Sequence, residues 1–419
     1  MNIICVHQSA DMYGSDRSFL QVVNYLSLSP NFEKITVVLP RNGPLVDELE
    51  KLKVEIIFMN LSLLSKTYLM KLQWGKIIFP LFSFSAKKKL FDQYDVVYVN
   101  TSVILDFYLL APFLKQMKII HIREIPNGII SKVLSFFLKC SKAKIIFNSQ
   151  STLNSFSPLA QSLVIHNAFE GFAKKSPAEI ALVSPEHDVL VTGNESLISE
   201  RETLTSGNEI TAGNEITKRV DTEKESAGSG IKQPEKAPLK ILLIGRINSW
   251  KGQDFAIEAL SGIPNADVLL RIVGSTSAGN EEMVQDLKKK VKQLGLTDKV
   301  EFMDFVRDTA EIYSWSDVAI VPSTRPEPFG RIAIEAMSLN KPVIAANHGG
   351  LPEIIEHGYS GFLFEPNNKA AFIKAISQYI DDPELLKKHG RNAKMVFEEK
   401  FSLIGFYKKL DEAFKKESA

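Results

Sequence analysis

The chain has 419 residues, too many for one ordinary hydrophobic core, and its length favours two or three domains. Its 50 Lys and Arg residues nearly balance its 49 Asp and Glu residues, so no global field attracts nucleic acid, and a polyanion must be bound locally. Cys5 and Cys140 stand in unrelated contexts without the spacing of a metal or disulfide framework, which is typical of a reducing compartment.

The first ten residues, MNIICVHQSA, lack the basic start and long apolar centre of a signal peptide. No uninterrupted apolar stretch reaches the roughly 18 residues that a membrane helix needs. We therefore expect a soluble or peripheral cytoplasmic protein.

Residues 1–170 predict a Rossmann-like domain. Helix-length segments such as SFLQVVNYL and PLVDELEKL separate short apolar runs that are rich in β-branched residues. Because these runs are apolar on both faces, they predict a parallel sheet covered on both sides. The predicted strands are NIICVH, KITVVLP, DVVYVN, KIIHIRE, AKIIFNS and LVIHN.

Residues 171–238 differ sharply in composition. Gly-Asn-Glu occurs three times, no aromatic residue follows Phe172, and small polar residues dominate. This composition indicates a low-complexity linker or insertion, since it offers too little apolar surface for a core.

Residues 239–400 repeat the α/β pattern, from the strand LKILLIGRI to the strand SGFLFEP. Residues 401–419 contain an amphipathic helix, FSLIGFYKKLDEAFKK, which we expect to pack back toward the N-terminal domain. Two Rossmann-like domains imply a cleft between them, with ligands at the carboxyl ends of the strands.

Two loops of the first domain follow predicted strands. Gly14 precedes a predicted helix, where a glycine allows close approach of the backbone and the helix N-terminus favours an anion. His121 ends another strand, next to Arg123 and Glu124. An ordinary turn glycine and a structural histidine remain open alternatives. The three spaced glycines of a dinucleotide fingerprint are absent, which argues against a nicotinamide enzyme.

The second domain opens with ILLIGRINSWKGQD, in which Arg246 and Lys251 flank a turn after a strand. A guanidinium fork and a mobile ammonium group suit a diphosphate where no metal is present. A solvated basic loop is the alternative interpretation.

The stretch RPEPFGRIAIEAM predicts a helix beginning around Phe329, directly after a proline. The backbone amides of Phe329, Gly330 and Arg331 would then face outward as an anion site.

Glu327 precedes that predicted helix and Glu335 lies two turns into it. At about 1.5 Å rise per residue, the two carboxylates lie on the order of 12 Å apart. That separation suits a nucleotide sugar, with Glu327 at the sugar hydroxyls and Glu335 at the ribose. A surface helix that carries two glutamates is the alternative.

Three segments, GRINSWKGQD, EPFGRIAIE and KPVIAANHGGLPEIIEHGYSGFLFEP, resemble the donor domain of the retaining glycosyltransferases of family four, which have the GT-B fold. The resemblance covers nearly all of residues 239–400. The first domain resembles the family more loosely, through MYGSDRS, HIRE and IIFNSQ, and the long linker departs from the family's compact hinge.

The resemblance implies a role for each matching residue. Arg246 and Lys251 hold the diphosphate, Glu327 contacts the donor sugar and Glu335 binds the ribose. His121 approaches the sugar near the reacting carbon, and the Gly14 backbone approaches the phosphate. The amides of Phe329, Gly330 and Arg331 form the phosphate cradle. The family needs no metal, and no cofactor is expected.

The family further implies sugar transfer from a nucleotide-diphosphate sugar to a glycan or lipid-linked glycan acceptor, in capsule, O-antigen or exopolysaccharide synthesis. The alternatives are a GT-B sugar-nucleotide epimerase, a phosphorylase, or a noncatalytic nucleotide-sugar-binding protein.

Two basic amphipathic segments could place the chain at a membrane that carries the acceptor. Both segments mix lysines with aromatic and aliphatic residues. One is GIISKVLSFFLKC, and the other contains Lys66, Lys71, Lys76, Lys87, Lys88 and Lys89. Such segments suit peripheral contact with an anionic membrane at its inner face. Core helices with snorkelling lysines are the alternative.

Overall fold

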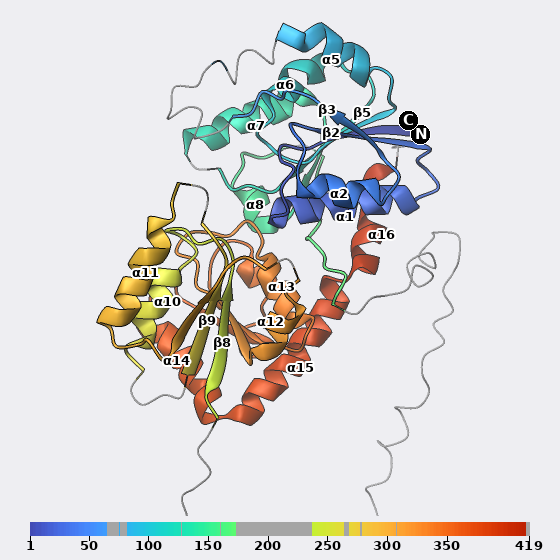
Figure 1. Cartoon of the computed structure of the whole chain (residues 1–419). Coiled ribbons are helices and arrows are strands. Elements are labelled where there is room, and N and C mark those ends of the chain that lie inside the picture. The colour runs from blue at the N-terminus through green and yellow to red at the C-terminus, as the bar shows by residue number, and fades with distance from the viewer. Residues whose placement is uncertain are drawn as a thin grey trace, which may run out of the picture.

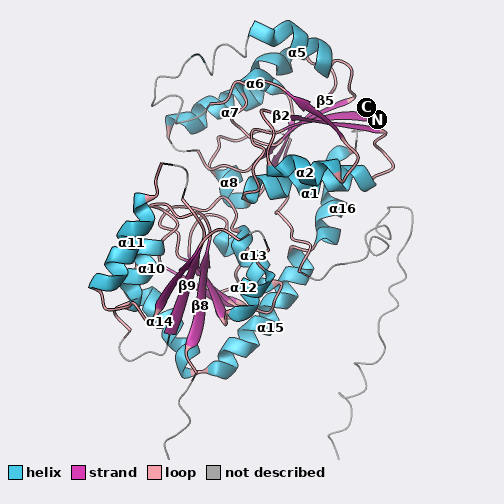
Figure 2. Ribbon diagram, viewed as in Figure 1, coloured by secondary structure: helices cyan, strands magenta, loops and turns pink. Residues whose placement is uncertain are grey.

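The structure is a computed structural model that describes residues 1–64, 75, 82–126, 128–159, 161–172, 237–263, 268–276, 279–306 and 308–415. Figures 1 and 2 show two lobes, one above the other, each with a sheet flanked by helices. Most of the predicted linker, and Lys66, Lys71 and Lys76, lie outside the described residues.

The described part of the upper lobe contains a seven-stranded sheet in the order β3-β2-β1-β4-β5-β6-β7, in which neighbouring strands pair in parallel. The strands are β1 (Asn2–Val6), β2 (Lys34–Leu39), β3 (Glu55–Phe58), β4 (Val96–Val99), β5 (Met117–Ile122), β6 (Lys144–Phe147) and β7 (Ser162–Val164). The helices are α1 (Gly14–Leu28), α2 (Pro44–Glu50), α5 (Phe84–Phe91), α6 (Leu105–Leu110), η2 (Ala111–Phe113), α7 (Ile129–Ser141) and α8 (Gln150–Asn154).

The described part of the lower lobe has a six-stranded parallel sheet in the order β10-β9-β8-β11-β12-β13. Its strands are β8 (Leu239–Ile244), β9 (Val268–Val273), β10 (Val300–Met303), β11 (Val318–Val321), β12 (Val343–Ala346) and β13 (Gly361–Phe364). Its helices are α10 (Gln253–Leu260), α11 (Glu282–Gln293), α12 (Ala310–Trp315), α13 (Arg331–Met337), η3 (Leu351–Glu353), α14 (Lys369–Asp381) and α15 (Pro383–Lys400).

The central strands are buried on both faces, as their continuous apolar runs predict. Every residue of β4, β11 and β12 is buried. The prediction of two Rossmann-like domains is confirmed. Helices α14 and α15 divide at Asp382, because its carboxylate caps the amides of Glu384 and Leu385 while Pro383 occupies the first position of α15.

The last helix, α16 (Leu403–Phe414), packs against the first domain although it follows the second in sequence. Phe406, Leu410 and Phe414 join the core that α1 covers, and Figure 1 shows α16 reaching up beside α1. The chain thus crosses between the lobes again at this point, where the Phe169 amide donates to the Phe401 carbonyl at 3.0 Å.

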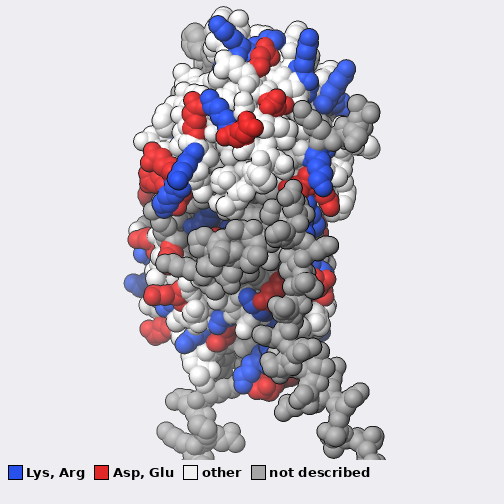
Figure 3. Space-filling view, turned by 90° about the vertical axis from the view of Figure 1, so that its right-hand side faces the viewer, with Lys and Arg blue, Asp and Glu red and all other residues white. Residues whose placement is uncertain are grey.

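On the face seen in Figure 3, basic and acidic side chains are interspersed, in keeping with the nearly balanced charge of the chain. Among the described residues, no helix has the length and apolar character needed to cross a membrane.

Candidate active site

A cavity of about 370 Å³ lies between the two domains and is lined by residues from both. The first domain contributes the start of α1 and the loops after β5, β6 and β7, and the second contributes the loops after β8, β9, β10 and β11 with the start of α13. All are carboxyl ends of parallel strands or the helices that follow them, which is where open α/β sheets bind ligands.

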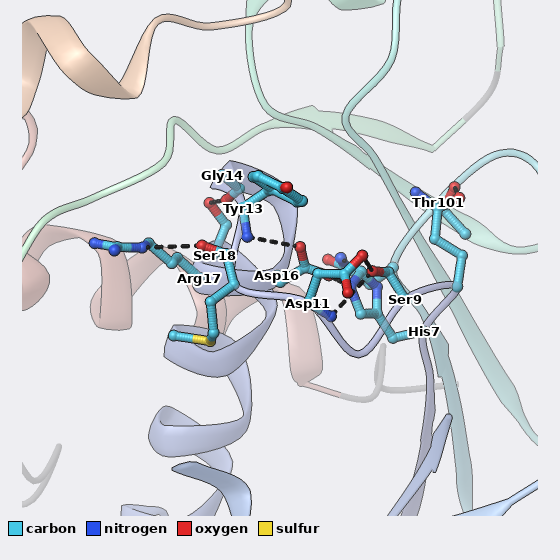
Figure 4. Close-up of polar contacts among 12 residues, drawn as sticks. His7, Ser9, Asp11, Tyr13, Gly14, Asp16, Arg17, Ser18 and Thr101 are labelled. Carbon is cyan, nitrogen blue, oxygen red and sulfur yellow. Dashed lines mark hydrogen bonds and ion pairs between the residues drawn. The ribbon is translucent and has the colours of Figure 1, made fainter. Parts of the chain in front are cut away.

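The start of α1 is held rigidly at the cavity. Asp16 accepts from the Tyr13 amide at 3.0 Å, and its other oxygen lies 2.9 Å from Nε2 of the buried His7. Figure 4 shows Asp16 between Tyr13 and His7, so that one carboxylate ties the loop before the helix to the end of β1. Gly14 is the first helical residue and lines the cavity, as its predicted role requires.

Arg246 and Tyr13 meet across the cleft. The guanidinium carbon of Arg246 lies 4.0 Å from the centroid of the Tyr13 ring, a cation–π contact between the two domains. Stacking covers the face of the guanidinium and leaves its in-plane N–H groups for an anion. The structure thus brings Arg246 and Gly14 to one cavity.

Lys251 and Glu327 form an ion pair in this structure, with Nζ 2.5 Å from Oε1. Ser323 donates to the same carboxylate oxygen at 2.6 Å. The backbone of Glu327 is fixed by Gly350, whose amide donates to its carbonyl at 2.8 Å, and by Gly349, where a Cβ would lie only 2.3 Å from that carbonyl oxygen. The sequence predicted both Lys251 and Glu327 but not their direct contact.

Helix α13 begins at Arg331, so the prediction of a start near Phe329 is wrong by two residues. Gly330 has φ of +117°, a left-handed conformation outside the helix, and a Cβ there would lie 2.6 Å from Leu351 Cδ2. Phe329 is buried against His166, with ring centroids 5.7 Å apart. The predicted cradle residues all line the cavity, but only Arg331 among them is helical.

Glu335 is buried, and each of its carboxylate oxygens accepts one hydrogen bond. Its two oxygens accept from Tyr313 at 3.0 Å and from Arg331 at 3.0 Å. Burial, with the Glu335 charge alongside, holds the pKa of Tyr313 well above its usual value. The tyrosine therefore stays a donor that orients the carboxylate. Glu327 and Glu335 line the same cavity, as predicted.

His121 lies behind the cavity wall and is not among the residues that line it. It is fully buried, and its Nδ1 lies 2.9 Å from the Tyr98 hydroxyl and 3.2 Å from Nη2 of Arg123. Burial and the neighbouring Arg123 hold the pKa of His121 well below its usual value. The residue of this strand end that lines the cavity is Arg123.

Sequence reasoning missed Tyr13 and Asn167 as cavity residues. Tyr13 lies in the loop after the buried strand β1, and Asn167 follows the short, partly exposed strand β7. Tyr13 precedes the candidate Gly14 in MYGSDRS, which was its only signal, whereas no charge or glycine pattern marks Asn167.

Comparison with known proteins adds a family and a fold. Residues 225–396 match the model of the family described as glycosyl transferases group 1. An uncharacterized glycosyltransferase of Methanocaldococcus jannaschii is 34% identical over 178 residues, 41% of this chain and 43% of that protein. The D-inositol 3-phosphate glycosyltransferase of Streptomyces avermitilis is 31% identical over 160 residues, 36% of this chain and 34% of that one. The chain therefore spans less than half the length of these curated relatives.

A solved structure is similar along nearly the whole chain. HepE of Anabaena, in complex with UDP and glucose, has a TM-score of 0.71 and 22% identity, and the match covers 98% of each chain. At this identity the likeness shows the fold, a GT-B arrangement of two Rossmann-like domains. Residues 225–396 of this chain with the GT-B fold thus match the glycosyl transferases group 1 family.

Proposed function

We propose that the chain is a retaining glycosyltransferase that moves a hexosyl or N-acetylhexosaminyl group from a nucleotide-diphosphate sugar to a glycan or lipid-linked glycan. The observation that carries the proposal is the convergence of Gly14, Arg246, Lys251, Glu327 and Glu335 on one cavity between two domains. Synthesis of a bacterial surface polysaccharide is the process that we propose for it.

In the proposed donor complex, the diphosphate lies between Arg246 and the start of α1. A helix N-terminus contributes typically 0.3–1 kcal/mol of attraction for an anion, and α1 begins at the cavity. Lys251 then exchanges its contact with Glu327 for a phosphate oxygen, which frees that carboxylate for hydroxyls of the donor sugar. Glu335 accepts from the ribose.

As the glycosidic bond breaks, negative charge grows on the leaving diphosphate and positive charge on the sugar. Preorganised cations stabilise the first charge without reorganisation. The acceptor attacks on the face of the leaving group, and a phosphate oxygen takes its proton, which retains the configuration. Because Arg246 and Lys251 supply the positive charge, we expect transfer to need no metal. Direct contact of His121 with the donor would require an opening of the wall that now covers it.

The donor is identified by a thermal-shift screen of UDP, GDP and ADP sugars, since a ligand that binds only the folded chain raises its apparent stability. UDP-glucose is the first to test, because structures of the similar Anabaena protein contain UDP-glucose and UDP. Slow hydrolysis of the bound donor is expected without an acceptor. Binding without hydrolysis or transfer would favour a noncatalytic binding protein, and interconversion of sugars would favour an epimerase.

Helix α7 supports a further proposal, peripheral contact with an anionic membrane. Its outer face exposes four large apolar side chains and two lysines. This pattern suits insertion among acidic headgroups. The apolar residues are Ile129, Ile130, Val133 and Phe136, and the lysines are Lys132 and Lys139.

Lys87 does not belong to such a surface, because it is buried and its Nζ lies 2.8 Å from Oδ1 of Asp106. Lys87 therefore fits the alternative interpretation, in which its helix belongs to the core and not to a membrane-binding surface. Sedimentation with anionic liposomes tests the α7 proposal. We expect binding that falls with salt and is lost in Phe136→Ser and in Lys132→Gln with Lys139→Gln, while Lys288→Gln on the second domain binds as the parent does. Salt-insensitive binding, or none, would contradict it.

A further inference from the structure

Arg123 is a buried cation on the first-domain wall of the cavity. It follows β5, lines the cavity and is 6% exposed. A guanidinium stays protonated at neutral pH, so this wall carries a positive charge that is largely removed from water.

All hydrogen-bond partners of the Arg123 guanidinium are neutral. Nε donates to Asn100 Oδ1 at 2.8 Å, Nη1 donates to Asn167 Oδ1, and Nη2 donates to His121 Nδ1 at 3.2 Å. Since arginine has no acceptor, His121 accepts with Nδ1, and its low pKa keeps the ring uncharged. Three of five N–H groups are thus used by neutral groups.

The adjacent carboxylate of Glu124 does not pair with this guanidinium. Its oxygens accept from the Thr101 hydroxyl at 2.6 Å and from the Ser102 hydroxyl at 3.0 Å, with the Ser102 and Arg123 amides at 3.2 Å. Among the described residues, no carboxylate lies within 4 Å of the Arg123 guanidinium nitrogens. Burial lowers the pKa of Arg123, and the charge of Arg331 lowers it further, while Tyr98 and the nearby charge of Glu124 offset only part of this shift.

A buried ion without a partner of opposite charge is costly unless a ligand supplies that charge. The described cavity lining also carries a net positive charge, which favours an anionic ligand. It has five basic side chains and only two carboxylates, those of Glu327 and Glu335. The excess of three exceeds the two negative charges of a donor diphosphate by one. Arg246 and Lys251 also stand on the opposite domain from Arg123.

We propose that Arg123 forms a second anion subsite in the cleft, which binds one phosphate or carboxylate group of a substrate other than the donor diphosphate. The inference rests on the proposed function, since it assigns a substrate class to the same cavity. The anion belongs either to the acceptor, as a sugar phosphate or uronate, or to the donor sugar, as a uronate. Asn100, Asn167 and His121 hold the guanidinium in place for it.

The test is titration with inorganic phosphate at constant ionic strength, on the chain saturated with the nucleotide that the thermal-shift screen selects. We expect phosphate binding that weakens at least tenfold in Arg123→Gln and only partly in Arg123→Lys. Asn167→Asp places an internal carboxylate beside Arg123 and should abolish phosphate binding without lowering the melting temperature. Arg271→Gln, outside the cavity lining, serves as the charge control.

Two further arms identify the source of the anion. If glucose 6-phosphate binds more tightly than glucose, and only when Arg123 is intact, the anion belongs to the acceptor. If UDP-glucuronate binds more tightly than UDP-glucose under the same condition, the anion belongs to the donor sugar. Phosphate binding equal in the parent, Arg123→Gln and Asn167→Asp would overturn the proposal. So would a loss of nucleotide affinity in Arg123→Gln as large as that in Arg246→Gln, since Arg123 would then belong to the diphosphate site.

If no nucleotide binds, the proposed function fails, and the phosphate titration of the nucleotide-free chain still tests Arg123. Binding that depends on Arg123 would support the subsite alone. Absent phosphate binding, or binding that is unchanged in Arg123→Gln, would contradict the proposed subsite.

Discussion

The Ser149 hydroxyl donates a hydrogen bond across the cleft to the carbonyl oxygen of Pro328, at 2.5 Å. Ser149 is the N-cap of α8 in the first domain, where its oxygen also accepts from the Thr152 amide at 2.9 Å. Thr152 Oγ1 donates to the same Pro328 carbonyl at 3.1 Å. Since Pro328 follows Glu327, the closed arrangement of the domains fixes the loop that carries this carboxylate.

Replacing Ser149 by Asp keeps a cap for α8 but removes the donor to Pro328 and sets a negative charge beside its carbonyl. We expect turnover to fall at least about tenfold, equivalent to about 1.4 kcal/mol, while nucleotide affinity changes little. The melting temperature should fall as well, because the new carboxylate stands at a fully buried position. Transfer rate at saturating donor measures this. Ser155→Ala, which loses a bond only to the Thr152 carbonyl of its own domain, is the control. Equal transfer rates in Ser149→Asp and Ser155→Ala would show that the contact between Ser149 and Pro328 does not support turnover.

Glu353 of the second domain accepts from the amides of Gln150 and Ser151, each at 2.8 Å, and from His166 Nε2 at 2.9 Å. Burial alone would raise the pKa of Glu353, but these hydrogen bonds hold it below its usual value. A lowered pKa means that the carboxylate stabilises the native state fully above its ordinary pKa of 4.5, and that this stabilisation is lost as pH falls through the lowered value.

Glu353→Gln should therefore reduce the free energy of unfolding by roughly 1–2 kcal/mol at neutral pH, and the difference should shrink as pH falls below the ordinary pKa of 4.5. Melting curves of parent and variant across this range check the prediction. Glu356→Gln, which removes an exposed ion pair with Lys400, should change little. A difference that stays constant with pH would show that the Glu353 charge does not stabilise the contact.

Glu335→Gln should weaken donor binding, whereas Glu327→Gln should mainly lower turnover. Ribose contacts change little during reaction, while contacts to the sugar change as charge develops on it. Separate measurement of donor affinity and of rate at saturation distinguishes the two. Glu335→Gln also leaves the partly buried Arg331 without its carboxylate, so the melting temperature of this variant must be recorded. Equal effects of both variants on both parameters would contradict the assignments.

Arg246→Ala and Lys251→Ala should lower turnover more than donor affinity, because the charge they face grows in the transition state. A loss of roughly 3 kcal/mol, or about a hundredfold in rate, is expected for each. Arg246→Lys should recover only part, since an ammonium group reproduces neither the fork nor the stacking on Tyr13. Rates with and without EDTA complete the test. Strict metal dependence, or near-normal turnover in both alanine variants, would overturn the mechanism.

Lys87→Met should destabilise the first domain by about 3 kcal/mol or more, because it leaves Asp106 buried without its cation. Lys88→Met, which breaks a half-exposed pair with Asp92, should cost less than about 1 kcal/mol. Urea unfolding of both variants compares the two lysines directly. A small effect of Lys87→Met would show that Asp106 finds another partner.

The order of strands and helices followed from the sequence because it depends on local pattern. Runs such as VVYV and VIAA are apolar on both faces, and only a sheet covered on both sides satisfies them. The edge strand β3, EIIF, was missed because its end residues are exposed and its run is short. Gly14, Arg246, Lys251, Glu327 and Glu335 could be predicted to share a cavity because they lie in loops, or in the helices, that follow predicted strands.

Contacts between distant segments required the tertiary structure. The pairing of Lys251 with Glu327, the stacking of Arg246 on Tyr13 and the burial of Lys87 each depend on packing between elements far apart in sequence. His121 and Arg123 lie two positions apart on one strand end, yet the first is enclosed and the second lines the cavity. Local pattern cannot separate such neighbours, because the surrounding loops and the opposite domain decide which side chain meets the ligand.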